Sequence, residues 1–348
     1  MIPPIAYIPS LEESNDAHTK PILCLRQSPT YLVSGSSDGS VRVWSKKDRK
    51  LALGPLTGSL GKSFRAVAIS EQLGVVIGGD TMGNVVVWRL EDGKQLLEQA
   101  CHDHAILSFA LREDMLVSSS KDQSAKVWTV DPAPNLPFRL QLRHTLQGHG
   151  MAVLSAQITD DRIYTSSGDK SLRIWDKESG ELKKSFHVVS SLVQFHIRPG
   201  ATNEQIVGAC SDGTIRLYDL NDDNELARLE GHTSVAYALD VFPANTAGAG
   251  KDVLKIASAS YDGTVRVWTL QQEKPFSSEC LRDLSYSEAM KTPLPIEQAA
   301  TDGEPENEKK GANRTMGVQV DGDRLYCCGE GAEIVVWDIT TTTDDSKE

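Results

Sequence analysis

The stretch VSGSSDGSVRVWS, residues 33–45, decides the fold of this chain. It joins a short run of small and apolar residues to a tight Asp-Gly turn, and then to an alternating run that ends at Trp44. An Asp-Gly turn between two such runs is a strong signal for a β-hairpin. In the second run Val41 and Val43 face one way and Arg42 faces the other, which is the period of two that a strand requires.

The same pattern occurs seven times along the chain. The six further copies are IGGDTMGNVVVWR (77–89), VSSSKDQSAKVWT (117–129), YTSSGDKSLRIWD (164–176), VGACSDGTIRLYD (207–219), IASASYDGTVRVWT (256–269) and CCGEGAEIVVWD (327–338). The aromatic residue that ends each copy recurs every 40 to 50 residues through the sixth copy, and Tyr218 replaces Trp in the fifth. A period in this range indicates a fold made of repeated supersecondary units.

A histidine marks the start of several copies. It lies 20 residues before the turn Asp and 26 before the Trp in the sets His18–Asp38–Trp44, His102–Asp122–Trp128 and His149–Asp169–Trp175. In the sixth copy His232 lies 30 residues before Asp262, which indicates an insertion of about ten residues in the same unit.

This combination of Gly-His and Trp-Asp markers resembles the WD40-repeat family. The resemblance extends over roughly residues 5–340. It implies an all-β fold, a seven-bladed WD40 β-propeller with four antiparallel strands per blade around a central channel. It also implies a hydrogen-bonded set of His, Ser or Thr, Asp and Trp within a blade. Carried over to this sequence, the four sets are His18, Ser34, Asp38, Trp44; His102, Ser118, Asp122, Trp128; His149, Thr165, Asp169, Trp175; and His232, Ser258, Asp262, Trp268.

Three copies depart from this pattern. The second has Lys62 and Met82 at the His and Asp positions, the seventh has Gly311 and Gly331, and the fifth has Tyr218 in place of Trp. We expect the corresponding blades to depend on apolar packing instead.

The last copy ends just after its Trp and lacks an outer strand of its own. The N-terminal stretch IAYIPSLEES, residues 5–14, is expected to supply that strand and close the ring, which removes an open sheet edge. We therefore expect one domain over residues 1–340, with a flexible acidic insertion at about 284–312, and a disordered tail at 341–348. The insertion is assigned from its Glu, Pro, Gly and Lys content.

Charge and composition limit the function. The formal net charge is −12, which argues against direct binding of nucleic acid or anionic membranes. No apolar stretch is long enough to span a membrane, and the N-terminus lacks the pattern of a signal peptide. Six scattered cysteines without a CxxC motif suit a reducing compartment, so we expect cytoplasm and/or nucleus. No catalytic motif or metal-ligand spacing stands out, so no enzyme activity, metal or cofactor is expected.

The resemblance implies a non-enzymatic protein–protein interaction scaffold, a monomeric propeller that presents binding loops within a multiprotein complex. By the same analogy, the residues just before the turn Asp and just after the Gly-His pair form a candidate partner-binding face: Arg65, Lys121, Met151, Tyr237, Tyr261 and Arg314. Two alternatives stay open. One is a substrate-recognition subunit of a ubiquitin-ligase assembly, and the other is a subunit of an RNA-processing or chromatin complex.

Overall fold

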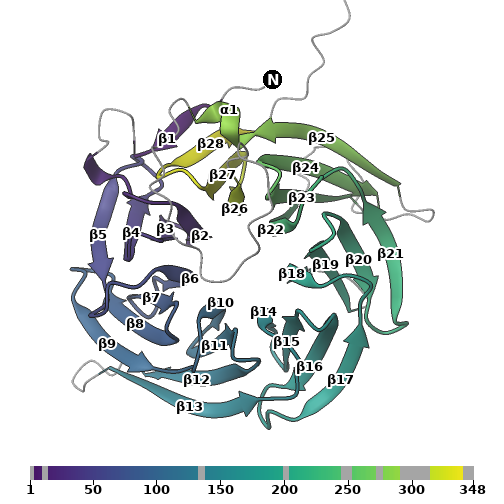
Figure 1. The fold of residues 1–348 in the computed structure, drawn as a ribbon, viewed down its shortest axis with the longest axis horizontal. Helices are drawn as coiled ribbons and strands as arrows, with labels where there is room; N and C mark the ends of the chain where they lie inside the picture. The colour runs from purple at the N-terminus through teal and green to yellow at the C-terminus, as the bar shows by residue number, and fades with distance from the viewer. Residues whose placement is uncertain are drawn as a thin grey trace, which may run out of the picture.

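The described part of the chain forms a ring of seven sheets, each with four antiparallel strands (Figure 1). The computed structural model describes residues 4–9, 15–131, 138–198, 204–243, 253–271, 277–290 and 314–339. The predicted seven-bladed propeller is therefore confirmed. The assignment of residues 1–340 to one domain stays a prediction.

The first four blades follow one another along the chain. Their strands are β2 (Ile22–Gln27), β3 (Tyr31–Ser36), β4 (Ser40–Ser45) and β5 (Leu51–Thr57) in blade 1; β6 (Phe64–Ser70), β7 (Val75–Asp80), β8 (Asn84–Arg89) and β9 (Gln95–Ala100) in blade 2; β10 (Ile106–Arg112), β11 (Met115–Ser120), β12 (Ala125–Asp131) and β13 (Arg139–Leu146) in blade 3; and β14 (Val153–Ile158), β15 (Arg162–Ser167), β16 (Ser171–Asp176) and β17 (Leu182–His187) in blade 4.

The remaining blades complete the ring. Their strands are β18 (Leu192–Ile197), β19 (Gln205–Cys210), β20 (Ile215–Asp219) and β21 (Asn224–Leu229) in blade 5; β22 (Ala236–Pro243), β23 (Val253–Ser260), β24 (Thr264–Gln271) and β25 (Ser277–Ser285) in blade 6; and β26 (Thr315–Asp321), β27 (Arg324–Gly329), β28 (Ile334–Asp338) and β1 (Ala6–Ile8) in blade 7. The strand named first in each blade lines the central channel (Figure 1).

The core lies between neighbouring blades. Seven clusters of buried apolar residues occur in the described chain, one at each interface between adjacent blades. Each contains the aromatic that ends one copy of the repeat, packed against the preceding blade: Trp44, Trp88, Trp128, Trp175, Tyr218, Trp268 and Trp337. The repeated aromatic is therefore the residue that joins one blade to the next.

The N-terminal strand closes the ring as predicted. β1 pairs antiparallel with β28, with Ala6 opposite Val336 and Ile8 opposite Ile334 (Figure 1). The Ile8 side chain is fully buried, in the cluster between blades 7 and 1. First and last copies thus share one sheet.

The predicted insertion begins too early. β25 continues to Ser285, and a short helix, α1 (Tyr286–Ala289), follows it. Leu284, Tyr286 and Met290 are buried between blades 6 and 7, because these apolar side chains gain more from burial than the polar residues beyond them could. Residues 291–313 and the predicted tail at 341–348 lie outside the described residues.

Candidate functional site

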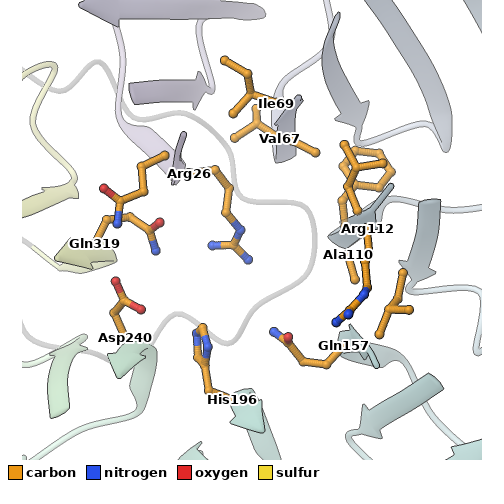
Figure 2. Close-up of a pocket in the computed structure, with 14 residues that line it drawn as sticks. Arg26, Val67, Ile69, Ala110, Arg112, Gln157, His196, Asp240 and Gln319 are labelled. Carbon is orange, nitrogen blue, oxygen red and sulfur yellow. The ribbon is translucent and has the colours of Figure 1, made fainter. Parts of the chain in front are cut away.

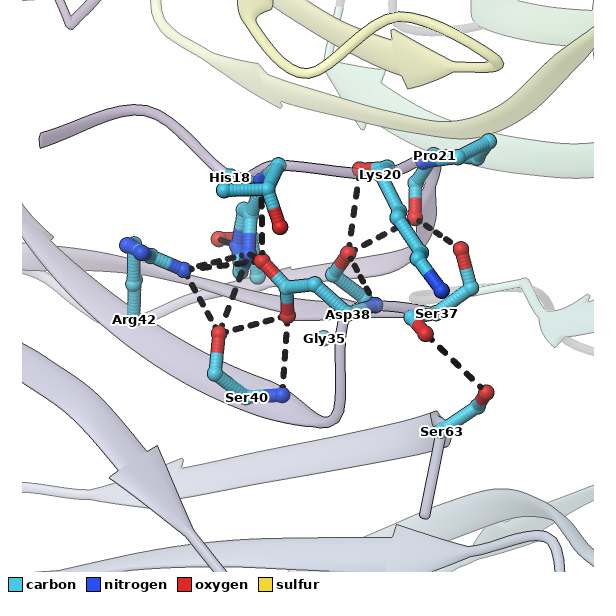
Figure 3. Close-up of polar contacts among 12 residues, drawn as sticks. His18, Lys20, Pro21, Gly35, Ser37, Asp38, Ser40, Arg42 and Ser63 are labelled. Atoms are coloured by element: carbon cyan, nitrogen blue, oxygen red, sulfur yellow. Dashed lines mark hydrogen bonds and ion pairs between the residues drawn. The ribbon is translucent and has the colours of Figure 1, made fainter. Parts of the chain in front are cut away.

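A chain of hydrogen bonds runs through blade 1, and Figure 3 shows the end of it at His18 and Asp38. Trp44 Nε1 donates to Ser34 Oγ at 2.8 Å. The same Oγ lies 2.8 Å from His18 Nε2, and His18 Nδ1 lies 2.9 Å from Asp38 Oδ2. The other three sets assigned from the sequence have the same connections, with distances of 2.7–3.1 Å: His102–Ser118–Asp122–Trp128, His149–Thr165–Asp169–Trp175 and His232–Ser258–Asp262–Trp268.

In blade 3 a neutral His102 imidazole with its proton on Nδ1 completes the chain of bonds. Nε2 then accepts from the hydroxyl and Nδ1–H donates to the carboxylate. Burial lowers the pKa of His102 and so favours the neutral ring. The charge of Asp122 and its hydrogen bond raise this pKa, but by less than burial lowers it. Burial would raise the pKa of Asp122, but hydrogen bonds from Ser124 and His102 lower it to about 2. The carboxylate therefore stays ionised while the ring stays neutral.

These sets fix one face of the ring. In all seven blades the turn between the second and third strands donates a backbone hydrogen bond to the segment before the inner strand. The donors and acceptors are Ser37 to Pro21, Thr81 to Ser63, Lys121 to Ala105, Gly168 to Ala152, Ser211 to Ser191, Tyr261 to Val235 and Glu330 to Arg314, at 3.0–3.1 Å. We call this side of the ring the turn face.

Blade 2 replaces the hydrogen-bonded set with aromatic packing. Phe64 meets the Trp88 ring edge-on, with centroids 5.5 Å apart. Gly78 occupies the position of the hydroxyl residue, and a Cβ there would lie 2.8 Å from Phe64 and 2.9 Å from Trp88. Asp80 holds the turn instead, since its Oδ1 accepts the backbone N–H groups of Met82 and Asn84 at 2.8 Å.

Blade 5 combines the expected apolar packing with an ion-paired cluster that was not expected. Phe186 does pack edge-on against Tyr218 at 5.5 Å. However, the buried Arg216 guanidinium also binds Asp212 and Glu225, each at 2.7 Å. This ion-paired cluster ties the turn to the outer strand β21.

Blade 7 is completed by α1 from the preceding connection. Gly331 stands at the position of the turn Asp, and a Cβ there would lie 2.6 Å from Met290 and 2.7 Å from the Tyr286 hydroxyl. Tyr286 donates to the Glu333 carbonyl at 3.3 Å. The buried helix therefore fills the space that a His–Asp pair fills in other blades.

The channel opens on the turn face into a cavity of about 220 Å³. The second residue of every inner strand lines it, and all seven come from equivalent positions: Leu23, Arg65, Leu107, Leu154, Val193, Tyr237 and Met316. Five of the seven are aliphatic or thioether side chains, so the mouth is an apolar ring interrupted by one cation and one aromatic. We call it the apolar mouth.

An aromatic and cationic cluster stands at one side of the apolar mouth. The rings of Tyr237 and Tyr261 stack with centroids 4.9 Å apart and planes 19° from parallel. Arg314 Cζ lies 5.1 Å from the centroid of the Tyr261 ring, within the range of a cation–π contact. Arg314 also forms an ion pair with Glu330 at 3.7 Å.

The structure places the six predicted face residues in two groups. Arg65, Tyr237 and Tyr261 line the apolar mouth, and Arg314 stacks on Tyr261. Lys121 and Met151 are exposed in the turn-face loops but do not line the cavity.

Sequence reasoning missed the five apolar residues of the mouth. The signal was available for three of them, Leu23, Leu107 and Leu154, which lie five places after the repeat histidine, as the predicted Tyr237 also does. Three more exposed apolar side chains lie in loops of the turn face: Leu60, Met82 and Val189. With Met151, four of the eight exposed large apolar side chains of the described residues therefore lie on this side.

The ring is a seven-bladed β-propeller, and three of its segments match WD40 repeats in sequence. The family model "WD domain, G-beta repeat" matches residues 10–45, 140–176 and 223–269. Of the four remaining blades, blade 3 has the complete hydrogen-bonded set, and blades 2, 5 and 7 have the departures described above.

Curated relatives share this region at modest identity. Protein DOA1 of Saccharomyces cerevisiae is 29% identical over 214 residues, which is 61% of this chain and 28% of that protein. The DDB1- and CUL4-associated factor 11 homolog of Caenorhabditis elegans is 24% identical over 73% of this chain and 43% of its own length. Nuclear distribution protein PAC1 of Coccidioides posadasii is 33% identical over 81% and 64%. The chain thus spans about a quarter to two thirds of these relatives.

Solved structures agree on the fold. The WD40 β-propeller domain of Doa1 superposes with a TM-score of 0.71 at 18% identity, covering 99% of this chain and 98% of that one. The computationally designed Ika8 protein superposes with a TM-score of 0.60 at 20% identity, covering 93% and 98%. In the described residues, no helix is long and apolar enough to cross a membrane.

Proposed function

We propose that this chain is a non-enzymatic interaction subunit that binds a peptide segment or domain of another protein on its turn face. The observation that carries the proposal is the apolar mouth with the stacked Tyr237, Tyr261 and Arg314 at its side. Aromatic, Met and Arg side chains are enriched in the centres of protein interfaces, and Tyr and Arg are frequent hot spots. A partially buried apolar ring of this kind loses water readily when a partner covers it.

The chemistry of the mouth points to the kind of segment it would take. An apolar side chain of the partner would enter among the aliphatic residues. Arg65 is exposed at the rim and would favour an acidic neighbour. We therefore propose an apolar anchor flanked by Asp or Glu as the recognised feature.

A ubiquitin-related role is the second candidate. It is supported by the names of relatives, since one is a homolog of a DDB1- and CUL4-associated factor. In that role the same face would recognise the substrate of a ligase assembly. The location is proposed as cytoplasm and/or nucleus, which is supported by six free thiols.

The test compares variants of the full chain in affinity purification from the native cell. Tyr261→Ala and Arg65→Glu should each lower recovery of the same partners about tenfold or more, and purified partner should bind each variant correspondingly less tightly. Leu142→Ala is the control, because Leu142 is an exposed side chain on the outer strand β13, away from the mouth. If both mouth variants keep every partner that wild type and Leu142→Ala bind, the site is assigned wrongly. Recovery of ligase subunits among those partners would favour the second candidate.

A further inference from the structure

The opposite end of the channel holds a second, polar chamber of about 260 Å³ (Figure 2). The fifth residue of every inner strand lines it: Arg26, Ala68, Ala110, Gln157, His196, Asp240 and Gln319. At this strand position two adjacent blades have alanine, and the other five have polar side chains. Hydrogen-bonding side chains therefore line one side of the chamber, and the two alanines lie on the other side.

Arg26 supplies hydrogen-bond donors to this space. Figure 2 shows its guanidinium projecting into the middle of the chamber. Its acceptor in the described chain is the Leu25 carbonyl, which Nη1 reaches at 3.1 Å. Burial lowers the pKa of Arg26, so the charge is held at a cost that nearby Asp240 only partly offsets.

Acceptors face Arg26 from the other side of the chamber. The carboxylate of Asp240 accepts the backbone N–H groups of Val241 at 3.0 Å and Val320 at 2.7 Å. Burial raises its pKa, against the opposing effects of His196 and Arg26. Within the described residues no direct ion pair joins Asp240 to Arg26, although the two charges are held in one chamber (Figure 2).

Two glutamines add further acceptors. Gln157 Nε2 donates to the Phe195 carbonyl at 3.3 Å, and Gln319 Nε2 donates to the Val318 carbonyl at 2.9 Å. Because their amide nitrogens are used in this way, their Oε1 atoms are the groups left to accept from a ligand. Arg112 also lines the chamber, but it forms an ion pair with Asp160.

We propose that this polar chamber binds a small zwitterion of the α-amino acid type, with its carboxylate on Arg26 and its ammonium between Asp240 and the glutamine oxygens. A planar guanidinium with spare donors matches a carboxylate. A half-buried carboxylate beside neutral acceptors matches an ammonium. A ligand with both groups would satisfy the two separated charges together, whereas a simple anion or cation would leave one of them without a counter-charge.

The size of the chamber supports a ligand of this class. Its volume is about 260 Å³, compared with about 30 Å³ for a molecule of liquid water, and drug-sized ligands occupy larger pockets. The two alanines leave room on the apolar side for a short side chain. Arg26 lines both cavities, but Asp240, Gln157 and Gln319 line only the polar chamber, so this inference does not depend on the proposed partner site.

The test measures ligand binding to the full chain by calorimetry and by thermal shift. Glycine, L-alanine and L-serine are the probes, while propionate carries only the carboxylate and propylamine only the ammonium. We expect saturable binding and a higher melting temperature with at least one amino acid, and binding about tenfold weaker or absent with the two single-charge probes.

Variants locate the site. Arg26→Gln and Asp240→Asn should each weaken amino acid binding about tenfold or more, and Arg26→Lys should keep part of it. Arg89→Gln is the control and should bind like wild type, because Arg89 pairs with Asp92 and lines neither cavity. Each variant is compared with itself with and without probe, so loss of stability alone does not count as loss of binding. Equal binding of propionate and amino acids, no response from the folded wild type, or unchanged binding in Arg26→Gln would each overturn the proposal.

Discussion

The hydroxyl group in each hydrogen-bonded set has two buried partners. Ser118 Oγ accepts from Trp128 Nε1 at 2.9 Å and lies 2.7 Å from His102 Nε2. The side chain is itself fully buried, so water cannot replace it when it is removed. An unsatisfied buried donor or acceptor costs about 1–3 kcal/mol. The Ser118 hydroxyl therefore holds both the Trp128 ring and the segment that contains His102 in place.

Removal of this hydroxyl should lower the free energy of unfolding by more than the loss of a single hydrogen bond would. We expect Ser118→Ala to lower the free energy of unfolding by about 2–4 kcal/mol, since it leaves two groups without partners. Ser119→Ala is the matched control, because Ser119 is equally buried on the same strand but makes one long bond of 3.4 Å to the Ser108 carbonyl. It should cost less than about 1 kcal/mol. Equal losses in urea unfolding would contradict the two-partner account.

At the scale of elements, β1 contributes three residues to a sheet whose other strands come from the far end of the sequence. Ile8 is buried beside Ile22 and Trp44, so it belongs to the interface between blades 7 and 1 as well as to its own sheet. Without β1, strand β28 would present a row of unpaired backbone groups at an open edge.

The closure predicts different effects for two isoleucines near the N-terminus. Ile8→Ala should lower the free energy of unfolding by about 2–5 kcal/mol, as for other buried large-to-small changes. Ile5→Ala should change it by less than about 0.5 kcal/mol, because Ile5 is 53% exposed. Removal of residues 1–14 should lower the melting temperature and cause concentration-dependent association through β28. An unchanged melting temperature in the truncated chain would refute the closure.

Sequence reasoning reached the elements that repeat and missed those that do not. The spacing of His, Asp and Trp was enough to predict seven blades and the strand exchange at the ends. It could not predict the Phe64–Trp88–Gly78 contact or the helix α1, because each occurs in a single blade and has no second copy to compare. The polar chamber was missed for a related reason. Its residues share one strand position but differ in type, and they converge only when the ring is closed.

At the scale of the whole molecule, pH acts on several blades at once. Burial lowers the pKa of His18, His102 and His149, so the unfolded chain binds protons at these rings before the folded chain does. Stability is then lost as pH falls below the ordinary histidine value of about 6.5. The pKa values of the partner carboxylates are also lowered, despite burial, by hydrogen bonds and neighbouring charge: Asp38, Asp122, Asp169 and Asp262. Their contribution is lost below about pH 4, the ordinary Asp range.

The melting temperature should therefore be nearly constant from pH 8 to 7, fall below about pH 6.5 and fall more steeply below about pH 4. Each histidine contributes a slope of up to about 1.4 kcal/mol per pH unit. Burial raises the pKa of Asp240, Glu330 and Glu333, which opposes the acid loss but involves fewer groups. His102→Gln should be less stable at pH 8 and show a flatter profile between pH 7 and 5. His187→Gln, at an exposed histidine of β17, should run parallel to wild type. A wild-type melting temperature that rises between pH 7 and 5, or an unchanged slope in His102→Gln, would show that the buried rings are not the groups that set the acid limit of this ring.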